Sequence, residues 1–540
     1  MKHWVARFAS VLGCAAILAT TGGATQAAGA RPTGAGSTMN VALTTALDTF
    51  DPADNNTAWF LNFSLYSYLI GINDKGQYFP DLASSMPSIS GNGLVYTFHL
   101  RKARFWNGTP VTAQDVVWSL NRTANPKTGS WAVGFMNSIA GFAAVESGHA
   151  KTLSGISAPN ASTVVIHLSS RDSAILGELA TGPMAILDPA QVEKYGSNYG
   201  LHPMGSGPYE IQSYLQGQRL VLTRNPYYYL TGTNGQRLPY VGRVDITLSV
   251  NPAVAALQIE KGQSDLLAGT LPKASYYTAI LNAQYRALVS RSPAWYTYQI
   301  ALNTSVKPFN NLKVREAVAL AVDRTQIAKA LGPYWIMPTV QRLPKGFPGY
   351  ENSFPYPKEN LTRAKALLKA AGFPHGFTTT YVVGNWPDVA NDTALAQVLQ
   401  SQLARIGIQL KIKVEGPSEV ATAVNTKGET PMFTVWWGAD FSDPYDFLNA
   451  QFGCSDFPPH GDNQMFWCNH TVDQLDNSAL TQLNRAKELA LYQQSEKIIQ
   501  ANFVYVPLFQ TYTVTMHSAR LTNFAVNPIY QWDFAQYRLK

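Results

Sequence analysis

One stretch of this chain restricts its fold more than any other, because a helix pattern runs into a strand pattern through a single glycine. The stretch spans residues 391–414 and reads NDTALAQVLQSQLARIGIQLKIKV. It predicts a helix that stops at Gly407 and then a strand, in which apolar and polar side chains alternate from Ile408 to Val414. Helices that alternate with strands are typical of α/β folds, so we expect that fold class here.

Two further helices are predicted from the spacing of apolar residues. We expect residues 310–331 to form one amphipathic helix, since valines repeat at every fourth residue from Val314 to Val322. Residues 360–373 predict a second helix, which ends where Gly372 takes the position after the C-cap. Both helices have a polar side and a buried side, as expected for helices that pack on a sheet.

Residues 93–123 combine a predicted strand, a turn and a predicted helix. The strand covers residues 96–100, and the helix begins at the letters TAQD. Thr112 and Asp115 have the spacing of a capping box, with Asp where Glu or Gln is commoner. We therefore expect the helix to start just after Thr112.

Composition indicates a large, well-buried globular protein. The 540 residues are 46% hydrophobic and 14% charged, which argues against disorder. The chain also holds 12 Trp, 27 Tyr and 24 Phe, which suit either a big core or a ligand cavity with aromatic walls. Basic residues are scattered rather than grouped, so we expect no nucleic-acid partner.

The first 30 residues are predicted to be a secretory signal peptide. Lys2 and Arg7 accompany an apolar run over residues 8–19, which is too short to span a bilayer. Cleavage after Ala30 would lower the formal net charge from +7 to +5, because two cationic side chains leave. An alternative cleavage before Cys14 would leave a lipid-anchored cysteine. In either case the mature protein would work outside the cytoplasmic membrane.

Two cysteines follow the signal segment, and a local disulfide between them is the expected outcome in an oxidising compartment. They are Cys454 and Cys468, within CSDFPPHGDNQMFWCNH. The alternative is a zinc site that also uses His460 and His470, but the spacing fits no common structural-zinc pattern. We expect no metal.

A search for catalytic motifs is mostly negative. The sequence has no Gly-x-Ser-x-Gly elbow, His-Glu-x-x-His helix, P-loop or dinucleotide fingerprint. Asp440 and Asp443 resemble a glycosidase pair flanked by Trp436 and Trp437, yet their spacing does not establish the required separation of two carboxyls. Asp443 precedes a proline and is predicted to be a turn residue.

Several ordered motifs make the chain similar to the bacterial extracellular solute-binding proteins of family 5, the peptide- and nickel-binding group of ABC importers. The central pattern stands here as Tyr96-Thr97-Phe98, Leu100-Arg101, Trp106-Asn107-Gly108-Thr109-Pro110, Thr112-Ala113 and Asp115-Val116. Further motifs occur along the chain in the family's order. LDTFDP and PDLASS precede the central pattern, and GSGPYEI, LTRNPYYY, IALNTSVKPFNNLKVREAVALAVDR, WWGADFSDP and VPLF come after it. The resemblance covers about residues 40 to 535.

The resemblance implies a periplasmic-binding-protein-like type II fold, with two α/β lobes, a cleft, a hinge and an extra domain in the first lobe. The implied divisions are 38–77, 204–297 and 507–540 for the first lobe, 78–203 for the extra domain, and 298–506 for the second lobe. Ligand would shift the equilibrium towards the closed form only by as much as its affinity for the closed form exceeds its affinity for the open form.

In function, the resemblance implies a monomer without a cofactor that delivers peptides to a membrane permease. The same scaffold could instead bind an oligosaccharide, an opine or chelated nickel. An extracellular hydrolase and a signalling receptor are more distant alternatives.

The resemblance also assigns the expected site residues. The carboxylate of Asp440 would pair with the α-ammonium group of a peptide, and Trp437, Gly438 and Ala439 would pair with its backbone as an added strand. Trp436 and Trp437 point to opposite faces of such a strand, so that one could line a side-chain pocket. The other expected contacts are Asn56, Thr57 and Ala58 on the opposite cleft wall and Phe509 near a crossing segment.

Overall fold

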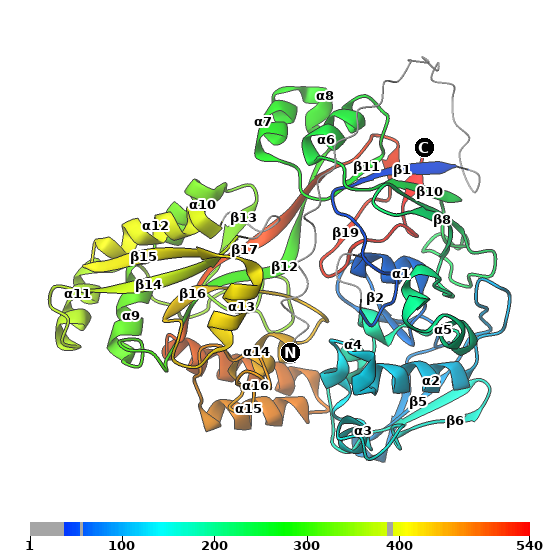
Figure 1. Ribbon diagram of the computed structural model, residues 1–540, viewed down its shortest axis with the longest axis horizontal. Helices are drawn as coiled ribbons and strands as arrows, with labels where there is room; N and C mark the ends of the chain where they lie inside the picture. The colour runs from blue at the N-terminus through cyan, green and yellow to red at the C-terminus, as the bar shows by residue number, and fades with distance from the viewer. Residues whose placement is uncertain (1–36, 55–57, 386–391) are drawn as a thin grey trace.

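The computed structural model of the protein describes residues 37–54, 58–385 and 392–540. The predicted signal peptide, Cys14, Asn56 and Thr57 lie outside these residues. Three sheets organise the described part, with five, four and six strands. Figure 1 shows the six-stranded sheet with its helices on the left and the other two sheets on the right.

The five-stranded sheet has the order β11-β1-β10-β9-β8. Strand β1 pairs in parallel with β10 on one side and β11 on the other, whereas β8, β9 and β10 pair antiparallel. The strands are β1 (Thr38–Leu43), β8 (Tyr209–Leu215), β9 (Arg219–Arg224), β10 (Arg243–Thr247) and β11 (Leu266–Ala268). Segments far apart in the sequence therefore share this sheet.

The four-stranded sheet is antiparallel throughout and carries the long helix α2 (Ala113–Ala124). Its strands, in spatial order, are β4 (Ser88–Ser90), β5 (Val95–His99), β7 (Thr163–His167) and β6 (Ile156–Asn160). The backbone N–H of Thr112 donates to Asp115 Oδ2 at 2.7 Å, and the reciprocal bond is also present. The capping box is thus confirmed, and the helix starts where the sequence predicts.

The six-stranded sheet has helices on both faces. Its strands, in spatial order, are β13 (Ile336–Pro338), β17 (Tyr505–Met516), β12 (Val289–Leu302), β16 (Met432–Gly438), β14 (Phe377–Gly384) and β15 (Ile408–Glu415). One face packs against α9 (Leu312–Ala321), α10 (Arg324–Leu331) and α12 (Asp392–Ala404). The other packs against α13 (Pro417–Asn425), α14 (Pro444–Phe452), α15 (His470–Leu480) and α16 (Arg485–Ala501).

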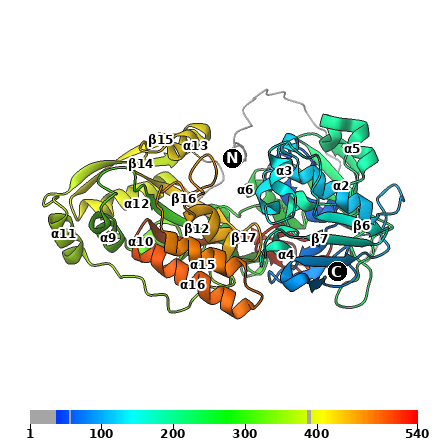
Figure 2. The same cartoon turned by 90° about the horizontal axis from the view of Figure 1, so that it is seen from below.

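Strands β12 and β17 link the two halves of the molecule. They pair antiparallel from Val289↔Met516 to Ala301↔Tyr505. Towards the five-stranded sheet, the backbone N–H of Leu271 donates to Val514 O at 2.8 Å. Figures 1 and 2 show both strands running between the halves. The protein therefore has the predicted type II fold, with two α/β lobes.

The remaining elements are short. The helices are α1 (Asn62–Leu65), α3 (Phe142–Glu146), α4 (Ile175–Glu178), α5 (Pro189–Tyr195), α6 (Pro252–Glu260), α7 (Lys273–Leu281), α8 (Ala283–Arg286) and α11 (Leu361–Ala370). Three strand pairs are β2 (Ile70–Ile72) with β3 (Tyr78–Pro80), β18 (Leu521–Thr522) with β21 (Arg538–Leu539), and β19 (Val526–Asn527) with β20 (Gln531–Trp532). Within the described residues, no helix is both long and apolar enough to cross a bilayer.

Two local predictions need correction. The single helix predicted over residues 310–331 is two helices, because the Asp323 carboxylate accepts from the N–H groups of Thr325 and Gln326 at 2.9 and 3.0 Å and so begins a new helix. In β15 the predicted alternation fails at Val414, which is 51% exposed. This strand lies at the edge of the sheet, where burial is incomplete.

Candidate ligand-binding site

The candidate site lies where β16 ends. Strand β16 pairs antiparallel with β12, which places Gly438 opposite Tyr296. On its other side β16 pairs with β14 in parallel at Met432 and Phe433. Beyond Gly438 the chain leaves the sheet, and the N–H of Ala439 donates to Trp295 O at 2.9 Å. This bond ties the site to β12, one of the two strands that link the lobes.

Trp436 and Trp437 face opposite sides of the sheet, as predicted. Trp437 is 5% exposed and packs in the core formed with α14 to α16, where its Nε1–H donates to Asp446 Oδ1 at 3.1 Å. Trp436 is partly buried on the other face and stacks on Tyr296, with ring centroids 5.2 Å apart. Of the pair, Trp437 is therefore a core residue, and Trp436 is the more exposed ring.

Gly438 is required by the protein's own packing. A Cβ at this position would lie 2.4 Å from Cδ2 of Tyr296, so the ring of that tyrosine fills the space of the missing side chain. The sequence predicts that small residues here admit a second backbone. The structure gives Gly438 an internal reason as well, because any larger side chain collides with Tyr296.

Asp440 is partly buried, and its backbone is held by a second carboxyl. Its N–H donates to Asp446 Oδ2 at 2.8 Å. Burial raises the pKa of the Asp446 carboxyl well above its ordinary value, and the negative charge of Asp440 adds to the rise. Asp446 thus orients both the Trp437 ring and the backbone of Asp440, which fixes where the Asp440 side chain begins.

Asp443 has a structural role, as its place before a proline predicts. Its Oδ1 accepts from the N–H of Tyr445 at 2.9 Å and caps α14, while Oδ2 forms an ion pair with Arg485. A carboxylate engaged in a cap and an ion pair does not serve as one half of a glycosidase pair with Asp440. The structure therefore removes the main support for that alternative.

Two other expected contacts have buried side chains in this conformation. Ala58 is fully buried in the first-lobe core, and its N–H donates to Asp48 Oδ1 at 3.3 Å. Phe509 is 1% exposed and stacks on Tyr298 with ring centroids 4.8 Å apart. Ala58 is therefore part of the first-lobe core, whereas Phe509 joins a row of rings that leads through Tyr298 and Tyr296 to Trp436.

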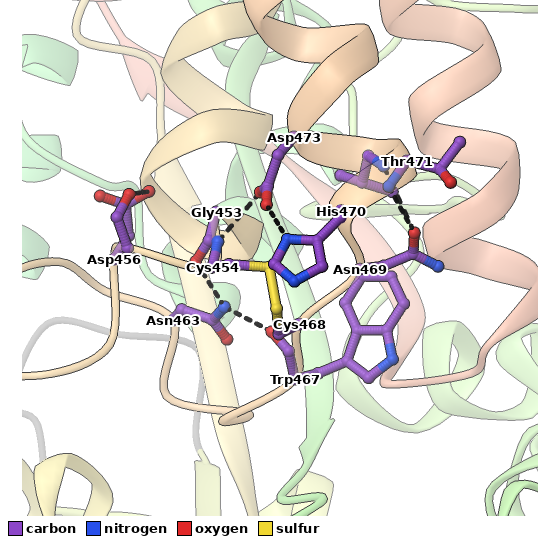
Figure 3. The surroundings of a disulfide bond; sticks show 12 residues. Gly453, Cys454, Asp456, Asn463, Trp467, Cys468, Asn469, His470, Thr471 and Asp473 are labelled. Carbon is purple, nitrogen blue, oxygen red and sulfur yellow. Dashed lines mark hydrogen bonds and ion pairs between the residues drawn. A yellow bond between two sulfur atoms is a disulfide. The ribbon is translucent and has the colours of Figure 1, made fainter.

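Cys454 and Cys468 form a disulfide with an S–S distance of 2.03 Å (Figure 3). Asp473 lies beside it, accepting from the N–H of Cys454 at 3.0 Å and approaching His470 Nδ1 at 3.3 Å. These four side chains are close enough to hold a metal, but His460 does not belong to the group. With both sulfur atoms in the disulfide, the thiolates needed for the zinc alternative are not available.

Three residues at the site were missed by sequence reasoning. Tyr296 stacks on Trp436, Asp446 orients the loop, and Arg485 pairs with Asp443. The alternating aromatics Tyr296 and Tyr298 in YTYQIAL are a sequence signal for the first. Asp446 contacts the end of β16 and the residues after it, and Arg485 joins α16 to the cap of α14. No local pattern specifies either contact.

Comparisons with known proteins give a consistent picture. The model of bacterial extracellular solute-binding proteins, family 5 Middle, matches residues 77–459. The glutathione-binding protein GsiB of Escherichia coli O1:K1 / APEC is 28% identical over 497 residues, which cover 90% of this chain and 92% of that protein.

Two solved structures share the fold. The clavulanic acid biosynthesis oligopeptide binding protein 2 superposes with a TM-score of 0.82 at 23% identity, covering 93% of this chain and 95% of that one. The periplasmic binding protein DppA from Helicobacter pylori, in complex with the peptide STSA, superposes with a TM-score of 0.76 at 24% identity, covering 93% and 98%.

Proposed function

The chain belongs to the bacterial extracellular solute-binding proteins of family 5, and from this premise we propose that it captures short peptides between its lobes and delivers them to the permease of an ABC importer. Support comes from relatives whose names specify glutathione and oligopeptide binding. The observation that carries the proposal for this chain is the position of Asp440, a partly exposed carboxylate at the end of β16 whose backbone is fixed by Asp446.

In this proposal the Asp440 carboxylate binds the α-ammonium group of the peptide, and the segment Trp437 to Ala439 hydrogen-bonds to the peptide backbone. Backbone hydrogen bonds give affinity without regard to side chains, whereas a fixed carboxylate selects a free amine. Trp436, stacked on Tyr296, provides an aromatic surface beside this segment. Such a division of roles suits a carrier of varied short peptides.

We place the first lobe at residues 38–77, 204–297 and 507–540, the extra domain at 78–203 and the second lobe at 298–506. This division is supported by the ladder between β12 and β17, whose register shifts between Tyr298 and Gln299. A bulge interrupts regular pairing and bends a strand locally. It lies beside both proposed crossings and is a suitable place for a hinge.

The proposal also includes the setting of the protein. The predicted signal peptide, residues 1–30, would export a monomer that acts outside the cytoplasmic membrane. The protein would bind its ligand without changing it. Incubation with a peptide should therefore release no product, and release of cleaved peptide would favour the hydrolase alternative.

Native mass spectrometry of the freshly purified protein tests the ligand class. We expect bound masses that match short peptides and that disappear after unfolding and refolding. An intact glycan, an opine or a nickel chelate at stoichiometric occupancy would overturn the peptide proposal while leaving the solute-binding fold intact.

A further inference from the structure

The two lobes meet at a second place, away from the linking strands. The segment around α4 in the proposed extra domain contacts the start of α16 in the second lobe. The backbone N–H of Ser173 donates to Leu480 O at 2.8 Å, and its Oγ–H donates to Glu488 Oε1 at 3.0 Å. Figures 1 and 2 both show α4 beside this part of the second lobe. The contact thus joins residues more than 300 positions apart in sequence.

Further contacts close this region. The N–H of Ser442 donates to the hydroxyl oxygen of Tyr78 at 3.0 Å. The rings of Phe135 and Phe441 meet edge to face, with centroids 5.3 Å apart. A Cβ on Gly177 would lie 2.8 Å from Cδ2 of Phe441, so the two lobes approach closely there. Side chains at this contact are consequently enclosed by both lobes.

Carboxyl groups from both lobes gather at this contact. The extra domain contributes two and the second lobe three, each at most 3% exposed: Asp172, Glu178, Asp443, Asp446 and Glu488. Arg485 pairs with Asp443 and Glu488, and the buried guanidinium of Arg342 lies near Asp446. If all five carboxyls were ionised, these two guanidinium groups would face five negative charges, and like charges in a buried setting repel strongly.

The groups that face Glu178 come from every element packed against it. Asp172 on its own lobe and Asp443, Tyr445 and Asp446 on the second lobe interact with Glu178 directly. Behind them, Tyr78, Arg485, Glu488 and Tyr492 interact with Asp443. Apart from Arg485, each is an acid or a phenol. A negative charge on Glu178 is therefore poorly compensated in this conformation.

The pKa values of Glu178 and Glu488 are raised, in agreement with this geometry. Burial raises the pKa of Glu178 well above its ordinary value, with further contributions from Asp172 and from the charges of Asp443 and Asp446 on the other lobe. Burial likewise raises the pKa of Glu488 to about 8, aided by Asp443 and opposed by Arg485. Opening the lobes would let water reach both carboxyls and would remove the charges of Asp443 and Asp446 from Glu178. Asp172 stays beside Glu178, and Asp443 and Arg485 stay beside Glu488, in either conformation.

We propose that the contact between α4 and the start of α16 is a proton-linked latch, in which closing the lobes takes up protons onto carboxyls shared across the contact. Because these groups hold their protons more tightly in the closed form, closure is favoured at low pH. It is disfavoured as pH rises through their closed-state pKa values. The latch depends on the two lobes and their hinge, so it does not require the ligand to be a peptide.

Single-molecule FRET between the lobes tests this proposal without any ligand. Dyes on Lys151→Cys and Lys369→Cys, both at exposed positions, report the distance between the extra domain and the second lobe. The mature chain is first unfolded with its disulfide intact and refolded, which removes cargo. We expect the closed fraction to rise as pH falls from 8.5 to 6, by up to about tenfold in the closed-to-open ratio per pH unit for each linked proton.

Glu178→Gln carries a permanently neutral group and should make closure less dependent on pH, with more closed protein at pH 8 than in the parent. Asp392→Asn is the matched control, since burial raises the pKa of Asp392 to about 7 but it lies in α12, away from the contact. In this control variant the closed fraction should change with pH as steeply as in the parent.

If Glu178→Gln fails to fold, as judged by circular dichroism, Glu488→Gln takes its place with the same expectation. A closed fraction that does not change with pH in the parent would overturn the proposal. The proposal would also be overturned if the closed fraction changed with pH equally steeply in the parent and in the folded Gln variant.

Discussion

The N–H of Asp440 and the Nε1–H of Trp437 both donate to the carboxyl of Asp446, at 2.8 and 3.1 Å. One buried acid therefore fixes the ring that fills the core and the backbone that carries the proposed ligand-binding carboxylate. Asp446, in α14, is buried, whereas Asp440, in the segment between β16 and α14, is partly exposed.

Asp446→Ala should destabilise the second lobe, because it leaves two donors without their acceptor. Each unsatisfied buried donor commonly costs about 1–3 kcal/mol. Urea denaturation should therefore show a lower midpoint with an unchanged slope. Asp446→Asn keeps one acceptor oxygen, so its stability should fall less than that of the Ala variant. Equal stability of the Ala variant and the parent would show that these bonds do not contribute.

Asp440→Ala should weaken peptide binding. Breaking a buried, hydrogen-bonded charge pair at an interface costs about 2–5 kcal/mol. This corresponds to roughly 30- to several-thousand-fold in affinity. Titration calorimetry with a peptide recovered by native mass spectrometry measures the change.

An N-acetylated form of the same peptide provides the control for Asp440. Acetylation removes the α-ammonium charge, so it should weaken binding to the parent protein but have little further effect on Asp440→Ala. Two independent, additive losses would place the ammonium group at another residue.

Gly438→Ala should destabilise the protein although it adds only a methyl group. The new Cβ would lie 2.4 Å from the Tyr296 ring, and overpacking of this kind costs about 1–3 kcal/mol. Thermal unfolding followed by tryptophan fluorescence would report both the loss and the disturbed stacking of Trp436. Combining Gly438→Ala with Tyr296→Ala should cost less than the sum of the single changes. Strict additivity would exclude the steric explanation.

The sequence predicts local structure well where a pattern decides it. Gly407 ends a helix, Thr112 begins another, and the strand from Ile408 has the expected position. Prediction from sequence fails where a single capping side chain sets a helix boundary. Asp323 begins a new helix although the apolar spacing continues unbroken across it. Local periodicity describes faces of elements, whereas a cap acts through one hydrogen-bonding group.

The candidate site shows a different limit. The approach of Tyr296 to Gly438 and the joint role of Asp446 arise from strand pairing and helix packing. Both bring together residues that no local pattern relates. The carboxyls Glu178 and Asp443 are 265 positions apart, and they interact because the segment around α4 packs against residues 441–443. Sequence reasoning therefore predicted the strand and, through resemblance, proposed Asp440, but it did not find the residues that contact them.

Asp476→Asn should stabilise the folded protein more at pH 8 than at pH 5. Burial within α15 raises the pKa of Asp476 from 3.8 to about 7, so the folded state holds this proton more tightly than the unfolded chain does. Stability contributed by the protonated group is complete below about pH 4 and falls as pH rises towards 7, because the unfolded chain releases its proton first. The neutral asparagine has no such dependence. Urea denaturation of both proteins from pH 4 to 8 measures the difference in their free energies of unfolding. This difference should grow in favour of the Asn variant up to about pH 7 and then level off. A difference independent of pH would show that Asp476 does not titrate in this range.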